Sequence, residues 1–307
     1  MSARTPARTL RRGEGAPVRN RNQGDLKLLL AELGQYLRQV RYFLRDPELI
    51  AASTEDLRHK MAYLSNLSQV VRLQYFDLEK NSGSDAGSHI LYHCLASIST
   101  RLHRRAELAL NVVRQVGNLS DPSFLDDYGL EEFFDEIDFG LALIRPALEQ
   151  RKFKLVVRMC QVEERLDALY ADRFRRLINE MDQGLGQPGD RVTTLMVVHY
   201  LERIGDLILE VGEQLIHVTL GENLRYSQYQ ALTAGLKASG QGLGLAGFQS
   251  IWTGRSGCRI CLVGCEEGEE GGQPVIFKHG PVAKLEKERD NLEIWGELWP
   301  GLTPRLR

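Results

Sequence analysis

Residues 201–213 read Leu-Glu-Arg-Ile-Gly-Asp-Leu-Ile-Leu-Glu-Val-Gly-Glu. Polar and apolar residues recur in this stretch at helical spacing, which predicts an amphipathic helix. At about 100° per residue, one side of this helix carries acids and histidines. They are His199, Glu202, Asp206, Glu210, Glu213 and His217. The opposite side is apolar, with Ile204, Leu207, Ile208, Val211 and Leu215. Such a helix can bury one face and present carboxylates on the other, which makes it a candidate site for a hard cation.

The same helical periodicity extends from Asp25 to about Gly221, and breakers divide it into six segments. We expect helices at 26–44, 54–79, 89–116, 130–149, 153–181 and 192–219. Asp46-Pro47 separates the first two helices, and Pro146 is expected to kink the fourth or end it early. Two triplets of long helices with short connections predict a mainly α protein built from two antiparallel three-helix bundles.

The two third helices of these triplets can be aligned with each other. Arg203-Ile204-Gly205-Asp206 corresponds to Arg104-Arg105-Ala106-Glu107, and Glu210 corresponds to Asn111. A basic residue, a small residue, an acid and a carbonyl-bearing side chain recur in the same order. The match indicates an internal repeat.

The segment Leu201-Glu202-Arg203-Ile204-Gly205-Asp206 closely resembles the signature of the PhoU family, the bacterial regulators of phosphate uptake. The resemblance covers about residues 24–221 and implies two three-helix bundles related by a repeat. Gly205 agrees with it, because glycine inside a helix costs roughly 1 kcal/mol relative to alanine and is best tolerated where a neighbouring backbone comes close.

The fifth helix carries the other element of the family, an acid and an aspartate four residues apart, here Glu163 and Asp167. PhoU proteins that this chain resembles hold multinuclear metal clusters on such surfaces, with the arginine of the signature, here Arg203, beside the ligands. When matching positions are compared, the resemblance implies five metal ligands in this chain, Glu163, Asp167, Glu202, Asp206 and Glu210. At the position of Glu210 the family usually has asparagine. Oxygen ligands suit Mg²⁺, Mn²⁺ or iron ions. The alternative is that these acids pair with arginines such as Arg165 and Arg203.

The length, charge and composition of the chain exclude several classes of protein. At 307 residues it exceeds one ordinary core, and its net charge of -2 argues against a nucleic-acid-binding protein. Five cysteines in a chain of this size fit a reducing compartment. No segment reaches the roughly 18 uninterrupted apolar residues of a membrane span, and the N-terminus resembles no secretory signal. We therefore expect a cytoplasmic protein that does not insert into a membrane.

These patterns predict four regions along the chain. Residues 1–23 form a basic tail whose composition cannot bury a core and is typical of disorder. The first bundle is expected at 24–120 and the second at 121–222. Residues 223–307 differ in composition, with glycine-rich turns and runs of alternating apolar and polar residues that are typical of strands. We expect strands at 247–252, 258–263 and 274–278 and a helix at 284–295.

The C-terminal region resembles the beginning of the N-terminal lobe of aminoglycoside- and choline-kinase-type phosphotransferases. The resemblance implies that Lys278 holds nucleotide phosphates and that Glu288, or alternatively Glu286, pairs with it. A small mixed sheet that caps the bundles is the other interpretation. The chain stops before a second lobe, so we expect no kinase activity and at most weak ATP binding.

Three cysteines of this region, Cys258, Cys261 and Cys265, lie within eight residues of one another. Their odd spacing on a strand places Cys258 and Cys261 on opposite faces, which disfavours a shared zinc or iron-sulfur site.

The leading hypothesis is a PhoU-like, non-enzymatic regulator. The family resemblance implies negative control of phosphate uptake through contact with a phosphate ABC transporter and a sensor histidine kinase, and a homodimer. One alternative is an incomplete small-molecule phosphotransferase with a helical regulatory domain. Another is a helical scaffold without a ligand.

Overall fold

A computed structural model of the chain describes residues 22–45, 47–83, 85–150, 152–221, 224–238, 248–253, 258–263 and 275–304. The chain divides into two compact units, Met1–Gln214 and Leu215–Arg307. The predictions for residues 1–21 of the basic tail and for Cys265 lie outside the described residues.

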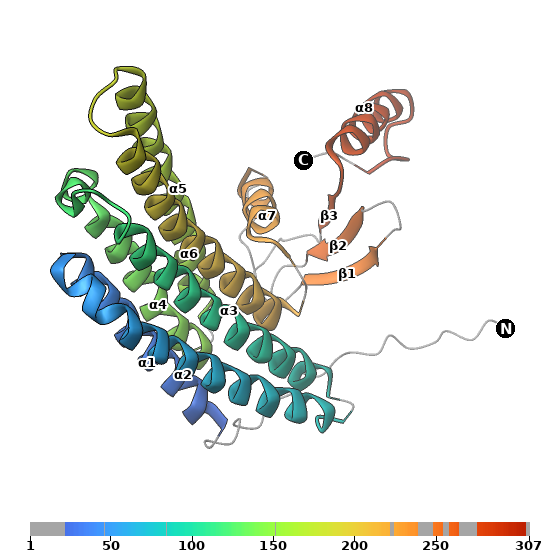
Figure 1. Ribbon diagram of the computed structural model, residues 1–307. Coiled ribbons are helices and arrows are strands. Elements are labelled where there is room, and N and C mark those ends of the chain that lie inside the picture. The colour runs from blue at the N-terminus through green and yellow to red at the C-terminus, as the bar shows by residue number, and fades with distance from the viewer. Residues whose placement is uncertain are drawn as a thin grey trace. The chain divides into compact units, whose positions relative to one another are not determined.

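Long helices build the first unit (Figure 1). They are α1 (Asn22–Arg45), α2 (Pro47–Lys80), α3 (Ala86–Val116), α4 (Leu130–Gln150), α5 (Phe153–Asp182) and α6 (Pro188–Leu220), the last of which continues into the second unit. The six helices predicted from the sequence are all present, and most extend a few residues further at one or both ends. Pro47 is the first residue of α2. Proline is well tolerated there, because the amide hydrogen that it lacks would have no partner in the first turn of a helix.

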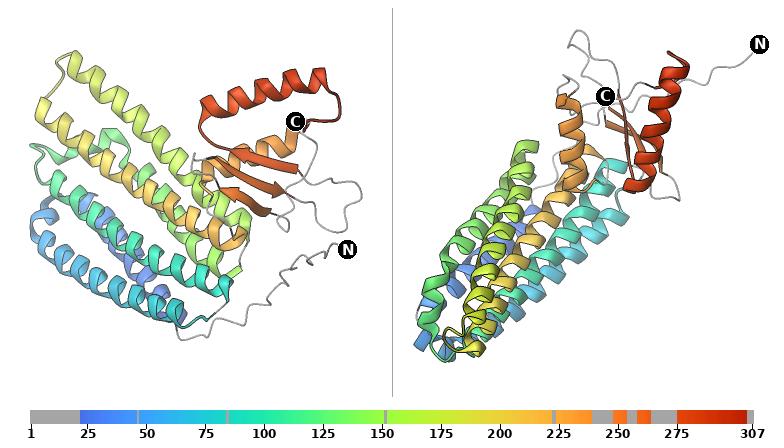
Figure 2. Two further views of the ribbon diagram at one scale, coloured as in Figure 1. Left: turned by 90° about the vertical axis from the view of Figure 1, so that its right-hand side faces the viewer. Right: turned by 90° about the horizontal axis from the view of Figure 1, so that it is seen from above.

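The helices run side by side, as both views in Figure 2 show. The helices α1, α2 and α3 pack against one another, and α6 packs against both α4 and α5. Leu29, Leu33 and Leu37 place the apolar stripe of α1 in the core, each at most 1% exposed. The stripe of α6 is also buried, including Ile204, Ile208 and Val211, each 0% exposed. The prediction of a mainly α fold with bundled helices is confirmed.

The fourth helix has the predicted extent to within one residue, and of the two effects expected of its proline, an early end does not occur. Pro146 lies inside α4, which continues to Gln150. The neighbouring side chains Ile144 and Ala147 are 0% and 4% exposed, and their burial stabilises the last turn against the loss of one backbone hydrogen bond.

Two helical segments were not predicted. The first is η1, a 3-10 helix at Pro122–Tyr128, which Asp121 caps by accepting a hydrogen bond from the Ser123 amide at 3.0 Å. Gly129 ends it at φ 59°, a left-handed conformation that glycine adopts without strain. The second is α7 (Tyr226–Ala238).

The second unit contains a three-stranded antiparallel sheet in the order β1 (Phe248–Thr253), β2 (Arg259–Val263), β3 (Val275–His279). The helix α8 (Val282–Leu298) follows directly. Lys278 pairs with Ile260 in the ladder between β2 and β3. The three predicted strands and the helix are present, and the sheet is antiparallel rather than mixed.

Candidate metal centre

Helices α5 and α6 bring three of the nominated acids together. Glu163 and Asp167 lie one turn apart on α5, and Asp206 lies on α6. One carboxylate oxygen from each of the three lies within 4.8 Å of the others. Among the described residues, this is the group of acids, histidines and cysteines spaced closely enough to share one ion.

Two glycines of α6 allow this close approach. A Cβ atom at Gly205 would lie 2.7 Å from Cδ1 of Leu166, and one at Gly212 would collide with Sγ of Cys160. Because real Cβ atoms do not approach other atoms so closely, larger side chains would push α6 away from α5. Gly205 therefore marks a close contact between the helices, although the nearest atoms belong to the Leu166 side chain and not, as expected, to a neighbouring backbone.

Burial and mutual repulsion raise the pKa of every acid in this group. Burial raises the pKa of Glu163 to about 7, and the charges of Asp167 and Asp206 add to it. The pKa of Asp167 is raised by burial and then by Asp206. Burial also raises the pKa of Asp206, although Arg203 opposes the shift. The positive charge near these carboxylates is thus too small to balance them.

Glu202 lies beside the group and completes the acidic cluster, by which we mean Glu163, Asp167, Glu202 and Asp206. Its side chain is 14% exposed, and burial raises its pKa to about 7, with Asp206 and Asp167 contributing. Its carboxylate lies 3.2 Å from Nδ1 of His199. Glu202 is therefore placed to support a bound ion even though it is not one of the three acids that meet most closely.

The arginines that could neutralise the cluster do so only in part. Arg203 contacts one carboxylate oxygen of Asp206 and is half exposed. Arg165 does not turn to the cluster and instead donates to Glu136 on α4 at 2.7 Å. The alternative of acids paired with arginines thus holds for Asp206, while the pKa values of Glu163 and Glu202 remain raised.

The structure does not bring Glu210 to the three clustered acids. Its carboxylate accepts a hydrogen bond from Nε of Arg101 on α3 at 2.7 Å. The fully buried Arg105 lies nearby, where burial lowers its pKa to about 9 and Glu210 partly offsets the shift. Nη2 of Arg105 donates to the Leu207 carbonyl at 2.5 Å. The role of Glu210 as a ligand stays a prediction, and the arginines of the first bundle compete for it.

Arg105 was not predicted to be a functional residue, although its position in the internal repeat indicated a special role. Arg105 aligns with Ile204, and both positions are completely buried. A charged residue at an apolar repeat position indicates a specific polar contact, which here joins α3 of the first bundle to α6 of the second.

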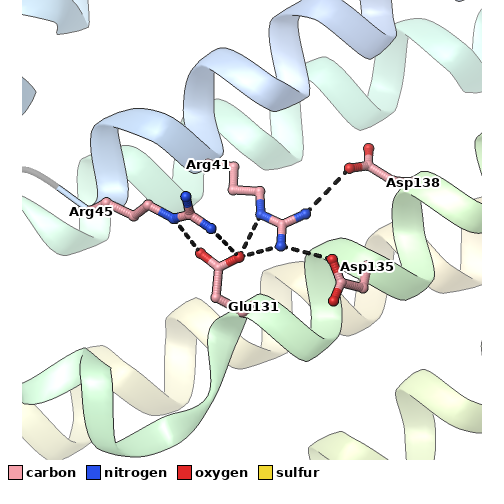
Figure 3. A network of polar contacts seen from close by, with 5 residues as sticks. All are labelled: Arg41, Arg45, Glu131, Asp135 and Asp138. Carbon is pink, nitrogen blue, oxygen red and sulfur yellow. Dashed lines mark hydrogen bonds and ion pairs between the residues drawn. The ribbon is translucent and has the colours of Figure 1, made fainter.

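A second polar network joins the bundles through α1 and α4 (Figure 3). Arg41 donates to Glu131 at 2.6 Å and to Asp135 at 2.7 Å, and lies 3.5 Å from Asp138. Arg45 binds both oxygens of Glu131 at 2.8 Å. The hydrogen bond from Arg45 lowers the pKa of Glu131 to about 2, and Arg41 contributes as well. These pairs fix how the bundle that carries the acidic cluster sits against the other bundle.

In the second unit, Nζ of Lys278 on β3 contacts Oε2 of Glu288 on α8, the pairing that the sequence predicted. Cys258 and Cys261 are both buried, at 6% and 0% exposed, and neither forms a disulfide. None of the described helices is both long enough and apolar enough to cross a bilayer.

The donor set of the acidic cluster fits a hard cation. Carboxylate oxygens are the ligands that Mg²⁺, Mn²⁺ and iron ions prefer, and no thiol lies in the group. The raised pKa values indicate carboxylates that a cation would stabilise. Fold and cluster together define a class of protein, one built from paired three-helix bundles with a carboxylate cluster on the surface of one bundle.

Comparison with known proteins finds similarity to PhoU proteins in this part of the chain. Residues 131–215, which include the whole acidic cluster, match the model of the PhoU domain. A phosphate-specific transport system accessory protein PhoU homolog of Clostridium acetobutylicum is 25% identical over 130 residues. The match covers 41% of this chain and 58% of that protein, so it spans less than two thirds of the relative.

Two solved structures share the fold of the helical part. The phosphate transport system regulatory protein PhoU of Streptococcus pneumoniae matches with a TM-score of 0.54 and 17% identity, covering 66% of this chain and 99% of that one. PhoU of Pseudomonas aeruginosa matches with a TM-score of 0.53 and 15% identity, covering 66% and 98%. The segment that matches the PhoU domain, residues 131–215, is also the one that carries the acidic cluster.

Proposed function

We propose that this protein is a non-enzymatic regulator of phosphate transport that binds Mg²⁺, Mn²⁺ or an iron ion through Glu163, Asp167 and Asp206. The observation that carries the proposal is the meeting of these acids within 4.8 Å inside the PhoU domain. The name of the Clostridium acetobutylicum relative, an accessory protein of a phosphate-specific transport system, supports the regulatory role.

Each residue of the cluster has a distinct part in holding the ion. Glu163 and Asp167 supply oxygens from α5, and Asp206 supplies one from α6, so a bound ion cross-links the two helices. Arg203 orients Asp206 through its contact with one carboxylate oxygen. Glu202 adds negative charge beside the site. Ion binding displaces protons from acids whose pKa is raised to about 7, so affinity increases as pH rises through about 7.

The partners are proposed from the similarity to PhoU proteins. A phosphate ABC transporter and a sensor histidine kinase would contact the helical bundles, and the chain would act as a homodimer. Co-purification of the full chain with the transporter, with and without phosphate starvation, tests this contact. A chain that never co-purifies with either partner contradicts the regulatory part while leaving the ion site open to its own test.

Elemental analysis of the purified full chain tests the ion site. We expect a stoichiometric hard cation in the wild type and its loss in Glu163→Gln and Asp206→Asn. Asp182→Asn is the matched control, because Asp182 is an exposed acid near the end of α5, away from the cluster. Equal metal content in all four proteins, or none in the wild type after loading with Mn²⁺, would refute the site.

A second candidate function rests on the contact between Lys278 and Glu288. This pairing of a strand lysine with a helix glutamate is the one expected if the second unit binds nucleotide phosphates, as in an incomplete phosphotransferase. Thermal stabilisation of the full chain by Mg-ATP, lost in Lys278→Met and kept in Lys287→Met, would favour it. No stabilisation by ATP in the wild type would contradict this second candidate function.

A further inference from the structure

The turn between α2 and α3 brings two histidines and a glutamate together. Glu79 lies in the last turn of α2, and His89 and His93 lie one turn apart on the same face of α3. Asp85 fixes the start of α3 by accepting hydrogen bonds from the Gly87 amide at 3.3 Å and the Ser88 hydroxyl at 2.5 Å. The beginning of α3 is therefore held in place opposite the end of α2.

One carboxylate oxygen of Glu79 faces both imidazoles. Oε1 lies 3.3 Å from Nε2 of His89 and 3.2 Å from Nδ1 of His93. The Glu79 side chain is only 11% exposed, whereas those of His89 and His93 are 57% and 64% exposed. The other oxygen, Oε2, is buried and has no hydrogen-bond partner. A nearly buried carboxylate thus lies beneath two imidazoles that are open to solvent.

These separations suit a small borderline cation. Zinc bonds to histidine and carboxylate ligands are about 2.0–2.1 Å long, which places neighbouring donors of a tetrahedral site about 3.3 Å apart. The two nitrogen-to-oxygen distances already have this value. Two histidines four residues apart on one helix face are also a spacing that binds zinc. The three donors do not all lie within 4.8 Å of one another, so binding requires one exposed imidazole to turn toward the other.

Lys80 is the neighbouring cation in sequence, and its ammonium lies 4.5 Å from the centre of the Phe76 ring. A neutral imidazole offers a lone pair rather than a charge, so a metal ion bound by both histidines would add positive charge beside the nearly buried carboxylate.

We propose that Glu79, His89 and His93 form a second cation site that takes a borderline transition-metal ion, with Zn²⁺ as its model. The site is chemically different from the acidic cluster because it has two nitrogen donors. It is also not the counterpart of that cluster in the first bundle. The residue aligned with Asp206 is Glu107, 14 residues or about 21 Å further along α3 than His93.

Titration of the metal-free full chain with Zn²⁺, in competition with a coloured chelator at neutral pH, tests the proposal. We expect a saturable site whose affinity falls at least about tenfold in His89→Ala, His93→Ala and Glu79→Gln. Because both histidines are exposed, their replacement leaves the helical core intact. Retained affinity in all three variants would overturn the proposal.

Two control variants separate this site from other modes of zinc binding. His59→Ala removes a still more exposed histidine of α2, 75% exposed, whose Nε2 lies 3.4 Å from Glu55, and Glu163→Gln disables the acidic cluster. Both should bind Zn²⁺ as the wild type does at this site. A loss of Zn²⁺ affinity confined to Glu163→Gln would assign the zinc to the acidic cluster. An equal loss of affinity in His59→Ala would indicate non-specific surface binding. Either result refutes the proposal.

Cobalt substitution gives a second readout, since a tetrahedral site with two imidazoles has visible absorption that His93→Ala should abolish.

Discussion

Replacement of Glu163 by glutamine should make the metal-free protein more stable and the metal-loaded protein less stable. Glutamine keeps the shape of the side chain and removes its charge. In the absence of metal this relieves repulsion with Asp167 and Asp206, whose oxygens lie within 4.8 Å. In the presence of metal it removes a ligand. The opposite signs distinguish an ion site from an ordinary network of surface charges.

The expected magnitude follows from these distances. Two unit charges 4.8 Å apart repel by about 1 kcal/mol in a water-like dielectric and by about 3 kcal/mol at an effective dielectric constant near 20. Asp167 is exposed, so screening favours the lower figure, and we expect Glu163→Gln to raise the free energy of unfolding by about 1 kcal/mol at pH 8.

The pH dependence has a definite sign. Because the pKa of Glu163 is raised from 4.5 to about 7, the native state binds more protons than the unfolded state between these values. The stability of the wild type therefore falls as pH rises through this window. Glu163→Gln lacks this loss, so its advantage should be small near pH 5 and complete above about pH 7.

Urea denaturation followed by circular dichroism measures the effect, with a chelator present or with saturating Mn²⁺. An ion at 100 times its dissociation constant stabilises the wild type by about 2.7 kcal/mol, and most of this gain should vanish in Glu163→Gln. Asp182→Asn should follow the wild type throughout. A metal-free Glu163→Gln protein that is less stable than the wild type at pH 8, or an advantage that is the same at pH 5, would show that Glu163 is not repelled by its neighbours.

Two further predictions concern the packing that positions the cluster. Gly205→Ala places a Cβ 2.7 Å from Cδ1 of Leu166, so we expect a loss of about 1–3 kcal/mol in thermal or urea unfolding. Gly189→Ala on the same helix meets no atom within 4 Å and should be neutral or slightly stabilising, and equal effects of the two would contradict the close contact. Glu131→Gln weakens the link to Arg41 and should cost about 1 kcal/mol near neutral pH, a value discounted because the Glu131 side chain is 44% exposed. The Glu131 pKa is lowered from 4.5 to about 2. The stability that Glu131 contributes is therefore complete above about pH 4.5 and disappears as pH falls through about 2. A difference in stability between wild type and variant that does not shrink on acidification would contradict this link.

The helices could be predicted because their signal is local. The apolar period of α6 and the four-residue spacing of Glu163 and Asp167 each depend on a few adjacent turns, and both appear in the structure as expected. The sequence left open whether Pro146 would end α4 early. The helix continues past it because burial of neighbouring side chains, a tertiary effect, outweighs the intrinsic cost of proline.

The helices, the polar face of α6 and the acids that could bind an ion follow from local sequence, since helical periodicity assigns each side chain to a face. Which of these acids meet depends on the packing of the helices. Asp206 joins Glu163 and Asp167 because glycine contacts set the separation of α5 and α6. Glu210, one turn further along α6, instead binds Arg101, 109 residues away in the chain. Partner choice depends on how helices from distant parts of the chain pack and rotate, and no local pattern contains that information.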